Sequence, residues 1–232
     1  MSLWPEVLVG GYPNSGTSFL CHLVVQLGKS PGSSENLKGA DSHNRWGYFE
    51  HLPIRKLVWE AGKWHHFTPD RKGFLPDEPL VFNDRPLVDY ADRIRRIAEE
   101  DGVELYKDNS LPLTFRLFPK ESKYIIITRR VEAIHESPKK AGFHGYTCSL
   151  EELRDSHYKY HELVKIMAGE VDCLTIQYED FKTSFDHTLQ VICNHLEVEL
   201  DKMHRTACRA IFRPHHASHR PIARIIEWLH KR

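Results

Sequence analysis

The segment 11–18 is the first in the chain whose residue types and spacing predict chemistry. It reads Gly-Tyr-Pro-Asn-Ser-Gly-Thr-Ser, a Gly-x4-Gly loop that follows an apolar run and precedes a helical pattern. In that context a loop wraps its backbone N–H groups around a phosphate at a helix N-terminus. Gly11 and Gly16 can adopt a positive φ and let a ligand approach closely. Three hydroxyl donors lie in the same loop, namely Ser15, Thr17 and Ser18. The alternative is a tight strand-to-helix turn with incidental glycines.

Residue 17 decides which kind of phosphate ligand the loop suits. A nucleoside-triphosphate loop has lysine there, which reaches the β- and γ-phosphates, followed by Ser or Thr for magnesium. Here the residue is Thr17. The loop therefore keeps the features that hold a phosphate but lacks the lysine of kinases and ATPases, which indicates another nucleotide. A kinase with a degenerate loop remains the first alternative.

The elements that position this loop alternate between strands and helices. Residues 6–12 form a short apolar run typical of a buried parallel strand, and residues 17–27 have apolar positions at helical spacing. The clearest buried strand is 123–128. Further strands are predicted at 103–107 and 173–177, with a short one within 31–47, and further helices at 52–61, 86–100, 149–168 and 185–196.

Strands that alternate with helices imply a parallel sheet with helices on both faces. We therefore expect a single domain over residues 1–232. Its fold class is α/β, a three-layer α/β/α sandwich with a mainly parallel sheet of about five strands. Ligands are expected at the carboxyl edge of that sheet.

Composition excludes several classes of function. Lys plus Arg and Asp plus Glu both number 32, whereas proteins that bind nucleic-acid backbone normally have a basic excess. No run approaches the ~18 apolar residues of a membrane span, and the first residues lack a signal-peptide pattern. The five cysteines are odd in number and widely spaced, which is typical of a reduced protein. We expect a cytoplasmic protein with neither a nucleic-acid partner nor a membrane span.

The 16 histidines raise the question of a metal site. His157 and His161 have the i, i+4 spacing of a helix, but no Glu follows His157 and no third ligand is evident. Solvated or hydrogen-bonded histidines explain the pattern better. We therefore expect no metal ion.

Two segments resemble the nucleotide motifs of the PAPS-dependent sulfotransferases. Residues 12–19 resemble that family's 5′-phosphosulfate loop, P-[KR]-[ST]-G-T-[ST], with Asn14 at the position of its Lys or Arg. Residues 128–137 resemble its 3′-phosphate motif, an Arg at a strand end and a Ser eight residues later, here Arg129 and Ser137. The guanidinium of an Arg can donate two hydrogen bonds to one phosphate, and a Ser two helical turns later lies on the same face of the helix that follows the strand.

Shorter matches extend the resemblance over most of the chain. Residues 46–50 resemble a Gly-aromatic-aromatic-Glu segment of bacterial members, residues 107–108 their Lys-Asp segment, and residues 178–181 the family's Tyr-Glu-Asp-Leu. The resemblance implies a P-loop-like fold. It also implies sulfuryl transfer from 3′-phosphoadenosine 5′-phosphosulfate (PAPS) to a hydroxyl or amine of a small-molecule or carbohydrate acceptor, which leaves 3′-phosphoadenosine 5′-phosphate (PAP). A protein that binds PAP or PAPS without catalysis is the second alternative.

The resemblance also implies roles for the matched residues. Glu50 is the first candidate for the base that takes the acceptor's proton, and His51 and His43 are the next. The alternative for Glu50 is a carboxylate at a helix start. Lys107, at a strand end, is assigned to the sulfate or the acceptor, the alternative being a surface lysine. The expected nucleotide-binding residues are Gly11, Pro13, Asn14, Ser15, Gly16, Thr17, Ser18, Arg129 and Ser137, together with Arg213 and Arg220 from a basic C-terminal segment.

Overall fold

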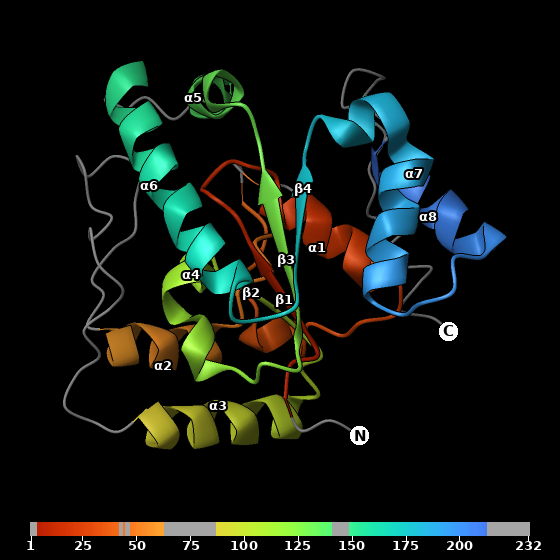
Figure 1. The fold of residues 1–232 in the computed structure, drawn as a ribbon. Coiled ribbons are helices and arrows are strands. Elements are labelled where there is room, and N and C mark those ends of the chain that lie inside the picture. Colours follow the sequence, from red (N-terminus) through yellow and green to blue (C-terminus); the bar gives the residue numbers. More distant parts are fainter. Residues whose placement is uncertain (1–3, 42–43, 45–46, 63–86, 141–148, 213–232) are drawn as a thin grey trace.

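A computed structural model of the chain describes residues 4–41, 44, 47–62, 87–140 and 149–212. Within this part, four parallel strands form one sheet in the order β2-β1-β3-β4 (Figure 1). The strands are β1 (Val7–Gly10), β2 (Leu105–Lys107), β3 (Lys123–Thr128) and β4 (Cys173–Gln177). Val9 of β1 pairs with Lys107 on one side and with Ile125 on the other. The loop after β1 therefore emerges between the carboxyl ends of two neighbouring strands.

The strand count differs from the expected five because the segment after residue 30 does not join the sheet. Pro31 forms an isolated antiparallel bridge with Val103, and Leu37 forms another with His51. Proline lacks the N–H that a central strand needs, and Gly32 turns the chain with a φ of 90°. Val103 pairs with Pro31, so the strand predicted from residue 103 begins at Leu105.

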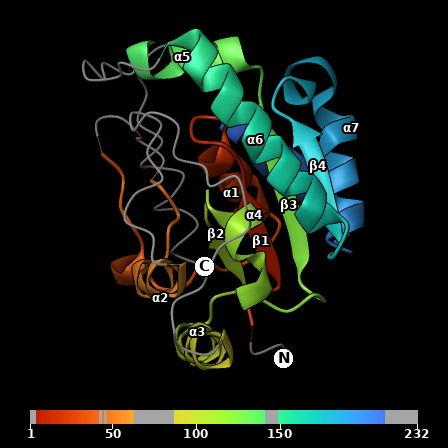
Figure 2. The same ribbon diagram turned by 60° about the vertical axis from the view of Figure 1, so that its left-hand side comes forward.

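Helices cover both faces of the sheet, which confirms the three-layer prediction (Figures 1 and 2). One side holds α1 (Thr17–Gln26), α7 (Asp180–His195) and α8 (Lys202–Phe212). The other side holds α2 (Leu52–Gly62), α3 (Leu87–Asp101), α4 (Leu111–Thr114) and α6 (Leu150–Ala168). The helix α5 (Val131–Lys140) follows β3 at the carboxyl edge and packs on α6. Two short 3-10 helices complete the described elements, η1 (Ser34–Asn36) and η2 (Phe115–Leu117).

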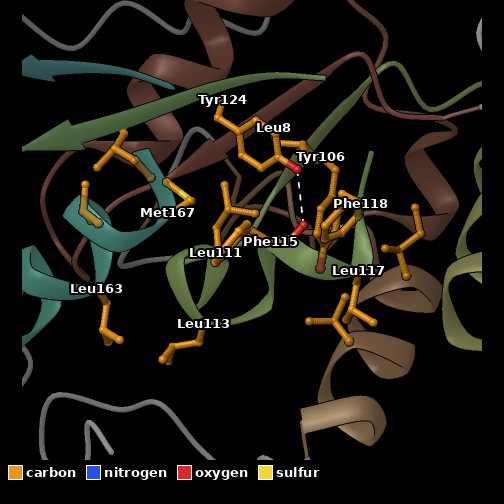
Figure 3. Close-up of a cluster of buried hydrophobic side chains, with 14 of the residues drawn as sticks. Leu8, Tyr106, Leu111, Leu113, Phe115, Leu117, Phe118, Tyr124, Leu163 and Met167 are labelled. Atoms are coloured by element: carbon orange, nitrogen blue, oxygen red, sulfur yellow. Dashed lines mark hydrogen bonds between the residues drawn. The ribbon is translucent and has the colours of Figure 1, made fainter. Parts of the chain in front are cut away.

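The strands supply two separate cores because successive side chains point to opposite faces of a sheet. Leu8 and Tyr124 belong to the core beneath α4 and α6, whereas Val9 and Ile125 belong to the core beneath α1 and α7. Figure 3 shows the first of these cores, in which the buried Tyr124 hydroxyl shares its hydrogen bond between the carbonyl oxygens of Phe115 at 3.2 Å and Pro119 at 3.0 Å. This bond satisfies the only polar atom of a side chain that otherwise packs as a hydrocarbon.

Most helices begin and end near their predicted limits. The helix predicted at 149–168 is present as α6, and Ser149 and Glu152 form the expected reciprocal capping box. The helix predicted from residue 185 begins earlier, at Asp180, and continues across a kink at Ser184, where φ is −148° and ψ is 54°. The helices α4 and α8 were not predicted. Among the described residues, no helix combines the length and the apolar character that crossing a bilayer requires.

Candidate functional site

The loop between β1 and α1 has the positive φ expected of its glycines at Gly16 but not at Gly11. Gly16 adopts a φ of 104° and forms the N-cap of α1. Gly11 does not adopt a positive φ, but a Cβ there would lie 2.5 Å from the Ser15 hydroxyl and 2.6 Å from the Ile127 carbonyl oxygen. The backbone N–H of Ser15 donates to the carbonyl of Tyr12 at 3.0 Å, which closes the turn.

The polar groups of this loop are arranged for an anion. Ser15 is fully buried, and its hydroxyl has no hydrogen-bond partner among the residues that the structure describes. No side chain caps the N-terminus of α1, where the first N–H groups have no intrahelical acceptor. The hydroxyl of Thr17 lies 3.4 Å from Asn109 Oδ1, and Asn44 Nδ2 donates to the Ser18 hydroxyl at 3.0 Å. A buried hydroxyl without a partner beside open N–H groups matches a phosphate site.

Arg129 connects the two predicted nucleotide motifs. It directly follows β3, and its Nη1 donates to the carbonyl oxygen of Asn14 at 3.0 Å. Its guanidinium also lies over the ring of Tyr178, 4.7 Å from the ring centroid. Its Nε is buried and lacks a hydrogen-bond partner within the described part of the chain. Ser137, the other residue of this motif, is half-buried in the second turn of α5.

The backbone conformation of residue 14 and its contact with Arg129 explain why an asparagine occupies this position of the loop. Asn14 has a φ of 66°, in the left-handed region, where asparagine is tolerated much better than Lys or Arg. Its side chain is exposed, whereas its carbonyl oxygen binds the guanidinium. Asn14 therefore contributes backbone geometry to the loop, and the guanidinium that binds its carbonyl comes from the residue after β3. The buried residues Tyr12 and Pro13 precede it in the loop.

Lys107 and Glu50 form a second group of charges at the same edge of the sheet. Lys107 ends β2 and is only 2% exposed, and its Nζ lies 3.4 Å from Glu50 Oε1. The other carboxylate oxygen of Glu50 accepts a hydrogen bond from Arg55 at 2.5 Å, and Arg55 stacks on Trp59. The structure thus brings two of the predicted catalytic residues together, and the burial of Lys107 rules out an ordinary exposed lysine at position 107. Tyr48 borders the pair, with its ring centroid 5.9 Å from Lys107 Nζ.

The turn after β2 is held by a buried carboxylate. Asp108 accepts hydrogen bonds from the Tyr106 hydroxyl at 3.0 Å and from both the N–H and the hydroxyl of Ser110, at 2.7 and 2.6 Å. Burial raises the pKa of Asp108, and the hydrogen bonds from Ser110 and Tyr106 oppose that rise. The turn presents Asn109 to Thr17 of the phosphate loop. Asp108 therefore positions the chain between Lys107 and the loop.

His51 is completely buried, and both of its ring nitrogens are engaged. Nε2 lies 2.7 Å from Asp101 Oδ2, and Nδ1 accepts from the N–H of Ile54 at 3.4 Å. Because Nδ1 accepts, Nε2 carries the proton that binds Asp101. Burial opposes the ionisation of Asp101, but hydrogen bonds from Ser33, His51 and Asn36 hold its pKa well below its usual range. His51 is a framework residue, and neither nitrogen is free to take a proton from an acceptor.

Three predicted residues, Arg213, Arg220 and His43, lie outside the described residues.

The two histidines with helical spacing are neighbours in the structure. His157 and His161 lie on α6 with their Nε2 atoms 3.2 Å apart. Within the described ranges, no group of three or more His, Cys, Asp or Glu side chains is arranged to hold a metal ion.

Four residues of the site had no predicted role, and each has only a weak signal in the sequence. Arg55 could have been suspected because it lies on the first turn of a helix that follows Glu50. Asn109 and Tyr178 lie inside matched segments, but nothing in those segments shows which side chain they contact. Asn44 gives no signal at all. In the structure Arg55 contacts Glu50 and Asn109 contacts Thr17. Tyr178 lies beneath the guanidinium of Arg129, and Asn44 contacts Ser18.

The loop geometry predicts the effect of filling the space at Gly16. Gly16→Ala would place its Cβ 2.6 Å from a ring carbon of Tyr178, at a φ that strains any L-residue. We expect this change to lower the free energy of unfolding by more than the ~1–2 kcal/mol that such backbone strain alone costs. Gly28→Ala is the matched control, because Gly28 has a φ of 93° but no atom within 4 Å of an added Cβ. Urea denaturation of both variants tests this, and equal losses would show that the Tyr178 contact has no effect.

Comparison with known proteins supports the fold. No protein-family model and no curated protein sequence matches the chain. The sulfotransferase domain from the curacin biosynthetic pathway superposes with a TM-score of 0.53 at 15% identity, over 89% of this chain and 78% of that one. Sulfotransferase STF1 of Mycobacterium tuberculosis has a TM-score of 0.48 at 14% identity, over 89% and 71%. Retinol dehydratase, solved with retinol and PAP, has a TM-score of 0.49 at 13% identity, over 90% and 65%.

Of these three structures, the curacin-pathway domain has a TM-score above 0.5, and the likeness to it concerns the arrangement of the elements. That arrangement is the parallel sheet with helices on both faces described above. The order of elements also agrees with the motifs, since the Gly-x4-Gly loop follows β1 and Arg129 follows the neighbouring strand β3. The chain therefore has the sulfotransferase fold.

Proposed function

We propose that this protein is a PAPS-dependent sulfotransferase that transfers a sulfuryl group to a hydroxyl or amine of a small-molecule or carbohydrate acceptor. The observation that carries the proposal is the contact between Arg129 and the phosphate loop, beside a buried Ser15 hydroxyl that lacks a partner in the described chain. A nucleotide with phosphates at both its 5′ and 3′ positions needs two such anion sites near each other.

The residues present fit such a nucleotide. The loop 11–18 offers backbone N–H groups and the Ser15 hydroxyl to the 5′-phosphosulfate end. Arg129 and Ser137 would hold the 3′-phosphate, with the Nε of Arg129 as a donor that the described residues leave unused. Thr17 occupies the position of the lysine that contacts the γ-phosphate in kinases, and this disfavours ATP.

Lys107 and Glu50 suit the chemical step. The acceptor oxygen or nitrogen attacks the sulfur, the bond from sulfur to the bridging phosphate oxygen breaks, and PAP leaves with that electron pair. We assign Lys107 to the negative charge that builds on the sulfuryl oxygens and the leaving oxygen, because a buried ammonium stabilises such charge better than a solvated one. Glu50 is assigned as the base that takes the acceptor's proton, and it also orients Lys107.

Nucleotide preference is the first test of the proposal. PAP is expected to raise the Tm, since a ligand at 100 times its Kd stabilises a fold by about 2.7 kcal/mol. ATP with magnesium is expected to give little or no shift, because the loop lacks the lysine for the γ-phosphate. A thermal-shift comparison of the two ligands measures both. Stabilisation by ATP with magnesium but not by PAP would favour a kinase instead.

Arg129→Met is expected to weaken PAP binding by about 10- to 150-fold, the range for a lost charged hydrogen bond. The affinity for adenosine 5′-phosphate, which lacks the 3′-phosphate, should fall much less. For this nucleotide the variant loses only the hydrogen bond from Arg129 to the Asn14 carbonyl. Calorimetric titration of both nucleotides gives the comparison. Arg130→Met is the matched control, since Arg130 is 73% exposed and its Nε pairs with Glu179 at 3.6 Å. Equal losses for the two nucleotides would mean that Arg129 does not bind the 3′-phosphate.

A protein that binds PAP without catalysis is the second candidate, and Asn14 favours it because the loop itself offers no cation. Turnover of PAPS with a panel of acceptors separates the two candidates. The location in the cytoplasm stays a prediction. It agrees with the free thiols of Cys21, Cys173, Cys193 and Cys208.

A further inference from the structure

Glu50 lies on a segment that folds back on itself. Leu37 and His51 form an antiparallel bridge, and the N–H of Lys38 donates to the carbonyl oxygen of Glu50 at 2.9 Å. The carbonyl oxygen of Lys38 accepts from the N–H of Tyr48 at 3.2 Å. This segment, called the Glu50 segment below, comprises residues 37–41, 44 and 47–51 of the described chain. The fully buried His51 holds one end of it in the interior.

Asn44 closes the turn at the other end of the Glu50 segment. Its backbone N–H donates to Asp41 Oδ1 at 2.8 Å, and its carbonyl oxygen accepts from the N–H groups of Asp41 and Gly47, both at 3.1 Å. Its Nδ2 donates to the carbonyl oxygen of Gly47 at 2.7 Å. Asp41 also accepts from the Tyr48 hydroxyl at 2.8 Å, so the turn orients the aromatic ring as well.

The amide of Asn44 also reaches the phosphate loop. Its Nδ2 donates to the hydroxyl oxygen of Ser18, in the first turn of α1, at 3.0 Å. A carbonyl oxygen can only accept, so the contact with Gly47 identifies the amide nitrogen, whose two protons serve Gly47 and Ser18. Because Ser18 Oγ accepts from Asn44, its own proton remains for another acceptor.

Resting on the proposed function, we infer that Asn44 is a positioning residue that ties the Glu50 segment to the phosphate loop and so places Glu50 relative to the sulfuryl donor. The segment is held at one end by the buried His51 and at the other by the bond from Asn44 to Ser18. Glu50 lies between these two anchors, where its carboxylate meets Lys107. A misplacement of about 1 Å can cost about 10²-fold in rate, so the second anchor matters for the reaction.

Amide hydrogen exchange without any ligand tests the anchor independently of the proposed function. Ser18→Ala removes the acceptor but leaves the turn around Asn44 in place, whereas Asn44→Ala removes both amide bonds. We expect exchange at the amides of Lys38 and Tyr48 to become about 3- to 10-fold faster in both variants, the scale of one lost neutral hydrogen bond. Asn194→Ala, at an exposed asparagine of α7, is the control and should change neither amide. Unchanged exchange at either amide in Ser18→Ala would overturn the inference.

The kinetics of Asn44→Ala supply the second test. We expect kcat to fall about 10- to 100-fold while PAP affinity stays within about 3-fold of the wild type. In the Glu50→Gln background the same change should lower kcat by less than about 3-fold, because its effect acts through the base. An unchanged kcat, a parallel fall in PAP affinity, or independent losses in the double variant would overturn the inference. If the wild-type protein does not turn over PAPS, the proposed function is wrong, and hydrogen exchange alone decides whether Asn44 anchors the segment.

Discussion

Glu50→Gln is expected to lower kcat by about 10²- to 10⁴-fold while PAP affinity stays within a few-fold of the wild type. The amide keeps the size of the carboxylate and can still accept from Arg55 or Lys107, but it cannot take the proton of the acceptor. The neutral amide no longer compensates the positive charge of the buried Lys107 ammonium, so the Tm should also fall. Steady-state kinetics with saturating PAPS, together with calorimetry of PAP binding, measure the two effects separately.

The neighbouring residue offers a matched control for this prediction. His51→Gln should lower the free energy of unfolding by about 1–3 kcal/mol, since Asp101 and the N–H of Ile54 lose a buried partner, and leave kcat within a few-fold. A Glu50→Gln enzyme that keeps its kcat would place the base elsewhere. A large loss of kcat in His51→Gln without a change in Tm would mean that His51 acts in catalysis after all.

Lys107→Met is expected to lower kcat by about 10²- to 10³-fold, the effect of removing one preorganised donor to charge that develops in a transition state. Methionine fills a similar buried volume but offers no positive charge to the sulfuryl oxygens. Glu50 keeps its hydrogen bond from Arg55, so the site should remain folded. The same assay on Glu50→Gln/Lys107→Met should show a loss smaller than the product of the single losses, because the two residues act as a unit.

Lys123→Met is the control for the loss of a lysine from a strand. Lys123 begins β3 at the opposite edge of the sheet, where it pairs with Asp172 and Glu197 at 3.0 and 2.9 Å. Its removal is expected to leave kcat within about 2-fold, because the exposed pairs there contribute little. If Lys107→Met lowered the Tm but left kcat unchanged, as Lys123→Met is expected to do, Lys107 would only compensate the charge of Glu50.

The positive charges of the candidate site lie outside the loop 11–18, whereas the loop motif that the sequence resembles contains a Lys or Arg. Asn14 takes a left-handed backbone conformation in place of a cationic side chain, and its carbonyl binds Arg129. The buried ammonium of Lys107 ends the strand on the other side of β1. Under the proposed function, cations from β2 and β3 flank the loop after β1, and the loop itself contributes N–H groups and a hydroxyl.

The amino-acid sequence by itself determined most of the elements and the place of the Gly-x4-Gly loop between a strand and a helix. The apolar runs of β1, β3 and β4, the helical spacing of α1 and the capping box of α6 are local patterns, and such patterns report backbone preference directly. The Gly-x4-Gly loop was predictable for the same reason, because the φ of 104° at Gly16 and the close approach of other atoms at Gly11 both favour glycine.

The tertiary structure alone decided which side chains meet. Arg129 contacts Asn14 across a separation of 115 residues, and Lys107 contacts Glu50 across 57. Parallel strands are joined through helices, so neighbours at the carboxyl edge are distant in sequence, and no local pattern records them. The burial of His51 and its bond to Asp101 had no signal in the sequence for that reason, because both depend on the packing of α2 against α3. Residue types limit what a site can do, but its chemistry depends on burial and partners that only the folded chain provides.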